Sequence, residues 1–341
     1  MARDLRSIGI SLRATITGSR NRSTATFSPT RAYSLGRIAI ETELSFAPLI
    51  WRGAASGQLP TYCARVSIFS LIVGVQMSDR VYAIHTDEEC ERLEAQALLA
   101  GVSDHIRHVP AQPGMRILDA GCGSGSMARE IAKAASGSAV VGIDLRDKYV
   151  DYARRRAEAE GLQNLTFEMG DVRELSFANG TFDIIWTKYL LQWVADPMRA
   201  MREFARVLKP GGLLVSANFD GFAVVNEPPD PAIQPMTEFV FNGLVDPFIG
   251  RKMATMCGEC GLIDIDVKME TDRVFTVVGS IDQERRRNWE IQWSGAKHRT
   301  AELLGSQTLA DAFIEKFITY QDRPDTATYC TLYIVSARKP F

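Results

Sequence analysis

The stretch Ile117-Leu-Asp-Ala-Gly-Cys-Gly-Ser-Gly125 decides the fold of this chain. A short apolar run ends at Asp119, and a tight cluster of glycines follows it, Gly121, Gly123 and Gly125. A helix-forming segment, 127–135, comes next. This order predicts a buried parallel strand, a sharp turn and a helix, which open a nucleotide-binding βαβ unit. Glycine suits such a turn because a ligand can lie against a backbone that carries no Cβ.

Strands and helices alternate along the chain after this turn. The apolar runs predict further strands over 139–143, 165–168, 182–186 and 213–217, with helices ending at Gly161 and spanning 197–208 between them. This spacing predicts an α/β fold with a doubly wound, mostly parallel, Rossmann-like sheet. Beyond residue 218 the alternation loosens, and we expect helical additions that cover an acceptor site. The pattern there predicts a helix over 250–260, a strand over 263–269, a long helix over roughly 297–321 and a last strand over 331–336.

A helix is also predicted before the glycine turn, from Asp87 onward. Apolar residues recur at helical steps and are expected to face the body, namely Leu93, Ala97, Leu98, Val102 and Ile106. The charged residues Glu88, Glu89, Glu91 and Arg92 are expected on the solvent side.

The first 76 residues differ in composition from the rest. They hold nine arginines, no lysine and three acidic residues, and they are rich in serine and threonine. Such a segment is typical of a mitochondrial transit peptide or of a dispensable extension, and both readings stay open. We expect residues 77–341 to form the folded domain, with a ligand-binding part over about 80–218 and an acceptor-binding part over about 219–330. The cytoplasm is the expected compartment, with the mitochondrion as the alternative if residues 1–76 are a transit peptide.

Composition narrows the class of partner. Residues 77–341 carry 38 acidic against 30 basic residues, which argues against binding to a nucleic-acid backbone. The longest apolar run is about half of the ~20 residues that a membrane-spanning helix needs. The single Cys257-Gly-Glu-Cys260 pair is weak evidence for zinc, so no metal is expected. A small molecule is the expected partner, and the oligomeric state stays open.

Acidic residues end the second and third predicted strands. Asp144 comes 23 residues after Gly121, where a carboxylate can accept both hydroxyl hydrogens of a ribose. Asp171 follows the third strand and can accept a hydrogen bond from an adenine amine while the backbone N–H of Val172 meets a ring nitrogen. Asp119 is expected to order the glycine turn and to help hold a cationic ligand end. Leu145, next to Asp144, is also expected to contact the ligand.

The segment Trp186-Thr-Lys-Tyr-Leu-Leu-Gln-Trp193 lies just past the fourth strand, at the edge where such sheets bind ligands. Thr187 and Lys188 are expected to lie beside the ligand that the glycine turn binds. Tyr189, Gln192 and Trp193, together with Asn218, are expected to border the acceptor. His85, Tyr189 and Asp220 are candidate bases, but nothing in the sequence separates them from structural residues, so the catalytic base stays unassigned.

These motifs occur in the order found in a known family. They are the glycine stretch itself, Val-Val-Gly-Ile-Asp144, Gly-Asp171, Phe-Asp-Ile-Ile-Trp-Thr187 and Leu-Lys-Pro-Gly-Gly212. The chain resembles the class I S-adenosylmethionine-dependent methyltransferases of the small-molecule type, most closely through residue 218. The resemblance implies S-adenosylmethionine as cofactor and methyl transfer to a small organic acceptor. It also implies that the segment Tyr82-Ala-Ile-His85 closes over the cofactor, with Tyr82 touching it and His85 near the acceptor.

Two alternatives from other classes remain. A nicotinamide-dependent oxidoreductase shares the strand, glycine turn and ribose acid, but Ser126 stands where the dinucleotide fingerprint has its third glycine. A non-catalytic regulator that binds the cofactor is the second alternative. Seven aromatic residues in the acceptor half favour an apolar or aromatic acceptor, namely Phe219, Phe222, Phe239, Phe241, Phe275, Trp289 and Trp293.

Overall fold

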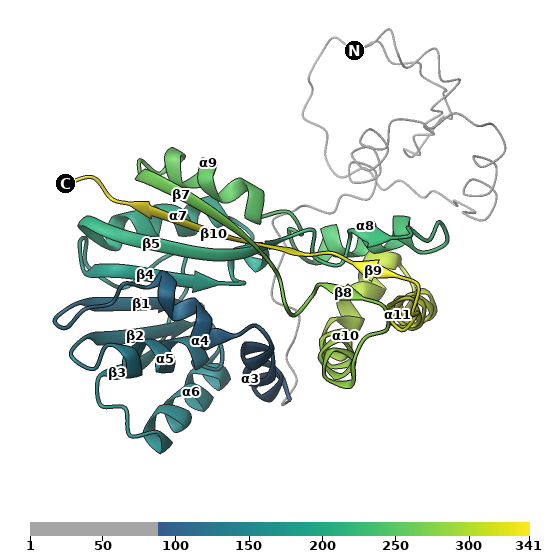
Figure 1. Cartoon of the computed structure of the whole chain (residues 1–341), viewed down its shortest axis with the longest axis horizontal. Coiled ribbons are helices and arrows are strands. Elements are labelled where there is room, and N and C mark those ends of the chain that lie inside the picture. Colours follow the sequence, from purple (N-terminus) through teal and green to yellow (C-terminus); the bar gives the residue numbers. More distant parts are fainter. Residues whose placement is uncertain (1–87) are drawn as a thin grey trace, which may run out of the picture. The chain divides into compact units, whose positions relative to one another are not determined.

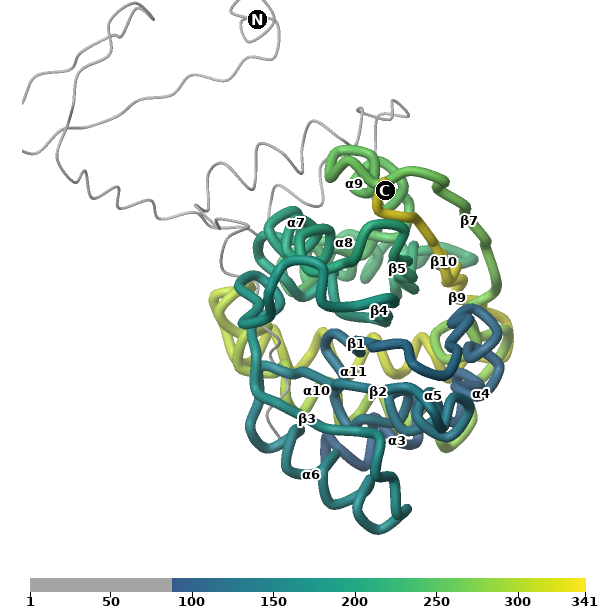
Figure 2. Tube along the Cα trace, turned by 90° about the vertical axis from the view of Figure 1, so that its left-hand side faces the viewer, coloured from purple at the N-terminus to yellow at the C-terminus, as the bar shows by residue number. Residues whose placement is uncertain are grey.

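The computed structural model describes residues 88–341, which centre on a seven-stranded sheet with the order β3-β2-β1-β4-β5-β10-β7 (Figure 1). Its strands are β1 (Arg116–Ala120), β2 (Ala139–Asp144), β3 (Leu165–Met169), β4 (Phe182–Lys188), β5 (Leu208–Asp220), β7 (Ile263–Thr271) and β10 (Thr331–Arg338). The first five are parallel, and β10 is antiparallel to both β5 and β7. Figure 2 shows the parallel strands following one another in this order. The doubly wound, mostly parallel sheet predicted from the sequence is confirmed.

Helices cover both faces of this sheet because its central strands are apolar on both sides. One hydrophobic cluster joins the sheet to α5 (Ser126–Ala134) and α6 (Asp147–Ala159), and another joins it to α7 (Pro197–Val207) and α9 (Met253–Glu259). Cys257 lies within the second cluster, fully buried. Two short turns, α4 (Val102–His105) and the 3₁₀ turn η4 (Ile106–His108), precede β1.

A third group of elements lies beside the end of the sheet where β4 stops (Figure 1). It contains α8 (Gln234–Leu244), α10 (Gln283–Leu304), α11 (Gln307–Gln321) and a small antiparallel sheet of β6 (Asn226–Glu227), β9 (Ala327–Thr328) and β8 (Val277–Val278). Its core is rich in aromatic side chains and includes Phe219, Phe222, Phe241, Phe275, Trp289, Trp293, Phe313 and Phe317. Two 3₁₀ turns complete the described chain, η5 (Leu191–Trp193) and η6 (Gly250–Lys252).

The prediction of one long helix over 297–321 is wrong. Two helices occupy this region, and the first begins at Gln283, where the side chain of Asp282 accepts a hydrogen bond from the Arg285 backbone. Gly305 ends it with a left-handed backbone (φ 68°), and Ser306 caps the next helix. These are ordinary helix stop and start signals, so the break was readable from the sequence. The Lys-Pro-Gly-Gly212 motif lies within β5, which has a register shift against β4.

The expected orientation of the first described helix, α3 (Glu89–Leu99), is confirmed for Leu93, Ala97 and Glu91 but is wrong for three other residues. Leu98 is 78% exposed, whereas Glu89 and Arg92 are buried. Arg92 donates from Nε and a terminal nitrogen to the two carboxylate oxygens of Glu89, at 2.7 and 2.6 Å. Its other terminal nitrogen donates to Asn288 Oδ1 on α10 at 2.7 Å. Because each buried charge has a partner, the polar face can turn inward.

Within residues 88–341, no helix is both long enough and apolar enough to cross a membrane. The predicted extension over 1–76 and the predicted contacts of Tyr82 and His85 lie outside the described residues.

Candidate functional site

A cavity of about 290 Å³ opens where the strand order reverses, between β1 and β4. A point where the strand order reverses commonly binds ligands, because the loops that follow the two adjacent strands turn in opposite directions and leave a crevice between them. Its walls come from α3, the glycine turn, the ends of β2, β3 and β4, and the aromatic core. The predicted residues that line it are Asp119, Gly121, Gly123, Asp144, Leu145, Asp171, Val172, Tyr189, Gln192 and Trp193.

The glycine turn has little room for side chains. Gly121 has a left-handed backbone (φ 72°), and a Cβ there would lie 2.7 Å from Leu190 Cδ1. A Cβ on Gly123 would lie 3.2 Å from Leu93 Cδ1 of α3. The backbone nitrogens of Gly121 and Cys122 both donate to the carbonyl of Ile143 at 2.9 Å, which fixes the turn against β2. The turn is therefore a close-fitting cradle on the cavity wall.

Asp144 connects the end of β2 to this turn. Its Oδ2 accepts from the Gly123 backbone nitrogen at 3.0 Å, and its Oδ1 accepts from that of Arg146 at 3.1 Å. Burial raises the pKa of this carboxyl, while these backbone donors oppose the rise. The carboxylate lines the cavity and stands where the sequence predicts a ribose-binding acid.

Asp119 lies at the floor of the cavity and is 2% exposed. Burial raises its pKa from 3.8 to about 7, a backbone hydrogen bond from Ala128 opposes the rise, and the nearby charge of Asp144 adds to it. Its contact is thus with the start of α5, while Asp144 and Ile143 hold the glycine turn. Asp119 Oδ2 has no hydrogen-bond partner within the described chain. A buried acceptor of this kind is suited to a cationic ligand group.

This pKa predicts a pH-dependent stability. Between about pH 4 and 7 the folded protein keeps a proton on Asp119 that the unfolded chain has released. The free energy of unfolding should therefore fall as pH rises through this window, by up to ~1.4 kcal/mol per pH unit. Urea unfolding of the wild type and Asp119→Asn at several pH values in the window tests this. In Asp119→Asn the free energy of unfolding should fall less with rising pH than in the wild type. The same pH dependence in both proteins would contradict a raised pKa for Asp119.

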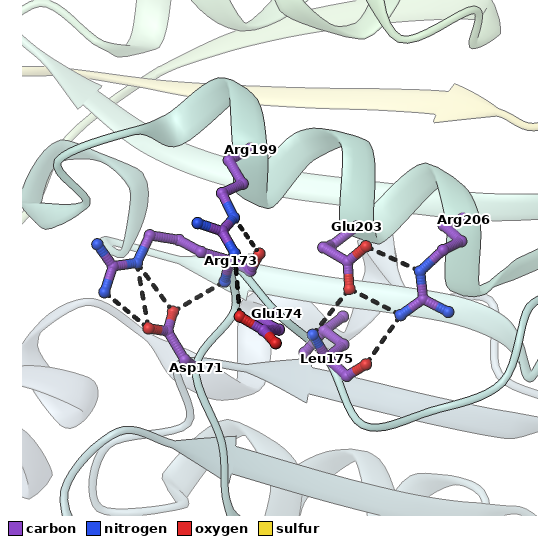
Figure 3. A network of polar contacts seen from close by, with 7 residues as sticks. All are labelled: Asp171, Arg173, Glu174, Leu175, Arg199, Glu203 and Arg206. Carbon is purple, nitrogen blue, oxygen red and sulfur yellow. Dashed lines mark hydrogen bonds and ion pairs between the residues drawn. The ribbon is translucent and has the colours of Figure 1, made fainter.

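Asp171 is held by a neighbouring arginine. Arg173 Nε donates to Oδ1 and Oδ2 at 3.1 Å each, and a terminal nitrogen donates to Oδ2 at 2.7 Å. The Arg173 backbone nitrogen also donates to Oδ1, at 2.9 Å. These bonds lower the pKa of Asp171. Figure 3 shows that Arg199, Glu203 and Arg206 of α7 bind the same loop at Arg173, Glu174 and Leu175. The loop is thus fixed to α7 with Asp171 ionised at the cavity.

The end of β4 carries polar groups toward the acceptor half. Lys188, Tyr189 and Gln192 line the cavity, and the Tyr189 hydroxyl donates to the buried carboxylate of Asp272. Gln192 is fully buried, and neither its amide nitrogen nor its amide oxygen has a partner within residues 88–341. Gln292 of α10 also lines the cavity with an unpartnered amide nitrogen. Unpaired buried amides are costly, and both residues line the cavity, where an entering ligand would supply the missing hydrogen-bond partners.

Aromatic side chains form the remaining wall of the acceptor half. Phe219, Phe222 and Phe275 line the cavity; the rings of Phe219 and Phe222 stack at 4.2 Å, and Phe275 meets Phe222 edge-on at 4.6 Å. The other aromatic residues predicted for this half lie in the aromatic-rich core around α8, α10 and α11 or pack against it, namely Phe239, Phe241, Trp289 and Trp293. Flat apolar walls of this kind suit a planar or apolar compound.

Some predicted residues lie elsewhere. Gly125, Thr187 and Asn218 are not part of the cavity lining. Thr187 and Asn218 are fully buried, because side chains alternate along β4 and β5 and theirs project away from the cavity. Asp220, a candidate base, is paired with Arg251 and is also absent from the lining. The lining also includes polar residues that were not predicted, among them Arg92, Gln96, Arg173 and Gln292.

Known proteins match this part of the chain. Residues 118–216 match the family described as a methyltransferase domain. An uncharacterized 37.1 kDa transposon protein of Streptomyces fradiae is 34% identical over 54% of this chain and 55% of its own. The 27-O-demethylrifamycin SV methyltransferase of Amycolatopsis mediterranei is 37% identical over 33% of this chain and 41% of its own. A crystal structure of the YcgJ protein of Bacillus subtilis covers 73% of this chain and 99% of its own, with 18% identity and a TM-score of 0.49.

Residues 118–216 therefore form a methyltransferase domain, and the curated relatives that match this part of the chain support the class I S-adenosylmethionine-dependent kind. The chain spans about half the length, or less, of the two curated relatives described above.

Proposed function

We propose that this protein transfers a methyl group from S-adenosylmethionine to a small, apolar or aromatic organic acceptor by in-line displacement. One observation carries the proposal: a single cavity joins the glycine turn and Asp144 to a wall of aromatic rings. A cofactor held at the first end and an acceptor held at the second would meet within the same cavity. Family membership supports the cofactor, and the aromatic wall supports the acceptor class.

The residues at the first end fit the cofactor. Asp144 would accept from the ribose hydroxyls, while Asp171 and Val172 would meet the adenine. The unpartnered Oδ2 of Asp119 would accept from the cationic amino-acid end. Because its glycines carry no side chains, the backbone of the glycine turn would lie directly against the ligand. The bound cofactor supplies a methyl group already activated on a sulfonium.

The protein's own task is then to position the acceptor. Holding the reacting atoms about 3–3.5 Å apart and in line can supply ~7–11 kcal/mol of the barrier. Stacked rings fix the plane of an apolar acceptor, and the buried amides of Gln192 and Gln292 fix its rotation by hydrogen bonds.

Transfer of a labelled methyl group tests the proposal. We expect the purified protein to move label from isotopically labelled S-adenosylmethionine into at least one component of a small-molecule extract from a strain that lacks the gene. Mass spectrometry identifies the product, and Asp144→Ala serves as the inactive control. Tight cofactor binding by calorimetry without label transfer to any component would instead favour the non-catalytic regulator.

A further inference from the structure

Lys188 is a half-buried residue at the cavity wall, and its amine lies beside an imidazole and a phenol ring. Its Nζ lies 3.2 Å from His105 Nδ1 and 4.7 Å from the centre of the Tyr189 ring. Burial, with the charge of Lys188 next, lowers the pKa of His105 to about 3, so this imidazole is neutral at pH 7. Burial also lowers the pKa of Lys188 to about 8. Neither neighbour therefore supplies a negative charge to the amine.

The charged groups around Lys188 are each engaged elsewhere. Asp272 accepts from the Tyr189 hydroxyl and, at 2.9 Å each, from the backbone nitrogens of Val274 and Phe275. Glu270 pairs with Arg107 at 2.7 Å, and Arg273 pairs with Asp104 at 2.8 Å. Within residues 88–341, no carboxylate lies in ion-pair contact with Lys188. A buried ammonium without a counter-ion is costly, so an anion that enters the cavity would stabilise it.

The surroundings of this amine are aromatic. The Tyr189 ring lies 5.8 Å from that of Phe219 and 6.0 Å from that of Phe275, and all three line the cavity with Lys188. The wall therefore offers flat apolar surfaces beside one cationic group. An aromatic ring that carries an oxyanion matches both features at once, because the ring packs on the phenylalanines while the oxygen meets the ammonium.

We propose that the acceptor is a hydroxylated aromatic compound, bound as its phenolate against Lys188. This inference rests on the proposed function and names its substrate class. The hydroxyl proton passes to the amine of Lys188 when that amine is neutral, or to solvent before binding when it is protonated. The phenolate oxygen then uses its electron pair to form the O–CH₃ bond as the S–CH₃ bond breaks and leaves its pair on sulfur. The products are an aryl methyl ether and S-adenosylhomocysteine.

A chromophoric phenol tests the inference without knowledge of the natural acceptor. The probe is 4-nitrophenol, whose neutral and phenolate forms absorb at different wavelengths, added to protein saturated with S-adenosylhomocysteine. We expect the bound probe to show the phenolate spectrum at a pH where the free probe is neutral. Lys188→Met should bind it about tenfold more weakly and without the phenolate band, whereas Lys188→Arg should keep the band. Lys133→Met, which removes an exposed lysine on α5, is the matched control.

Each other result overturns the inference. Binding of the probe as neutral phenol, or no binding at all by the wild type, excludes a phenolate site even if the variants fail to fold. A phenolate band that survives in Lys188→Met assigns the anion to another group. If Lys188→Met weakens S-adenosylhomocysteine but not 5′-methylthioadenosine, which lacks the amino-acid end, Lys188 binds the cofactor's carboxylate instead. Failure of the wild type to bind S-adenosylhomocysteine would overturn the proposed function itself, which separates the two failures.

Discussion

Replacing Arg92 with methionine is expected to lower the free energy of unfolding by ~3–5 kcal/mol, because the buried carboxylate of Glu89 would lose the guanidinium that contacts both of its oxygens. Glu89 is fully buried, and both of its carboxylate oxygens accept from the Arg92 guanidinium. The same guanidinium binds Asn288, so the substitution also removes a hydrogen bond between α3 and α10. Urea denaturation measures the change.

Two controls separate the ion pair from simple loss of a side chain. The double variant Glu89→Gln/Arg92→Met removes both charges and should recover a large part of the lost stability. Arg299→Met breaks a pair with Glu302 that is largely open to solvent, and its effect should stay below ~1 kcal/mol. If the single Arg92 variant is no less stable than the Arg299 variant, the buried network does not hold α3 in place.

The second large effect is expected at Asp144. Asp144→Ala should weaken the binding of S-adenosylmethionine by roughly 2–4 kcal/mol, because it removes two charge-assisted hydrogen bonds to ribose. It also releases the Gly123 and Arg146 backbone nitrogens, which the carboxylate now orders. Calorimetric titration gives the affinity. Asp147→Ala, three residues on and exposed, is the matched control and should bind as the wild type does. Unchanged affinity in a folded Asp144→Ala protein would remove Asp144 from the site.

The sheet could be predicted from the sequence because its strands carry local signals. The apolar runs before Asp119 and Asp144 end within a residue of β1 and β2, since a buried parallel strand must be apolar on both faces. The motif residues that end these strands line the cavity because parallel strands bring their carboxyl ends to one edge. Local pattern and tertiary structure therefore agree across this half of the chain.

The acceptor half was less predictable for a physical reason. Arg92 looked like a solvent-facing residue because its partner Asn288 lies 196 positions away, and no periodicity reports such a pair. The orientation of Lys188 is equally nonlocal, since it depends on His105 and on the ring of Tyr189. Thr187 and Asn218 were placed at the site by their position in the motifs, but the alternation of side chains along a strand turns them away from the cavity.

Helix α3 contacts both ends of the cavity, and this position has a thermodynamic consequence. Leu93 lies close to Gly123 of the glycine turn. Arg92, one residue earlier, donates a hydrogen bond to Asn288 of α10, next to the aromatic wall of the cavity. A ligand that orders α3 by binding at one end of the cavity also orders the part of α3 that the ligand at the other end contacts. Binding energies linked in this way are reciprocal, so the factor by which cofactor raises acceptor affinity equals the factor by which acceptor raises cofactor affinity. Cooperativity between the two ligands would then reside in one short helix.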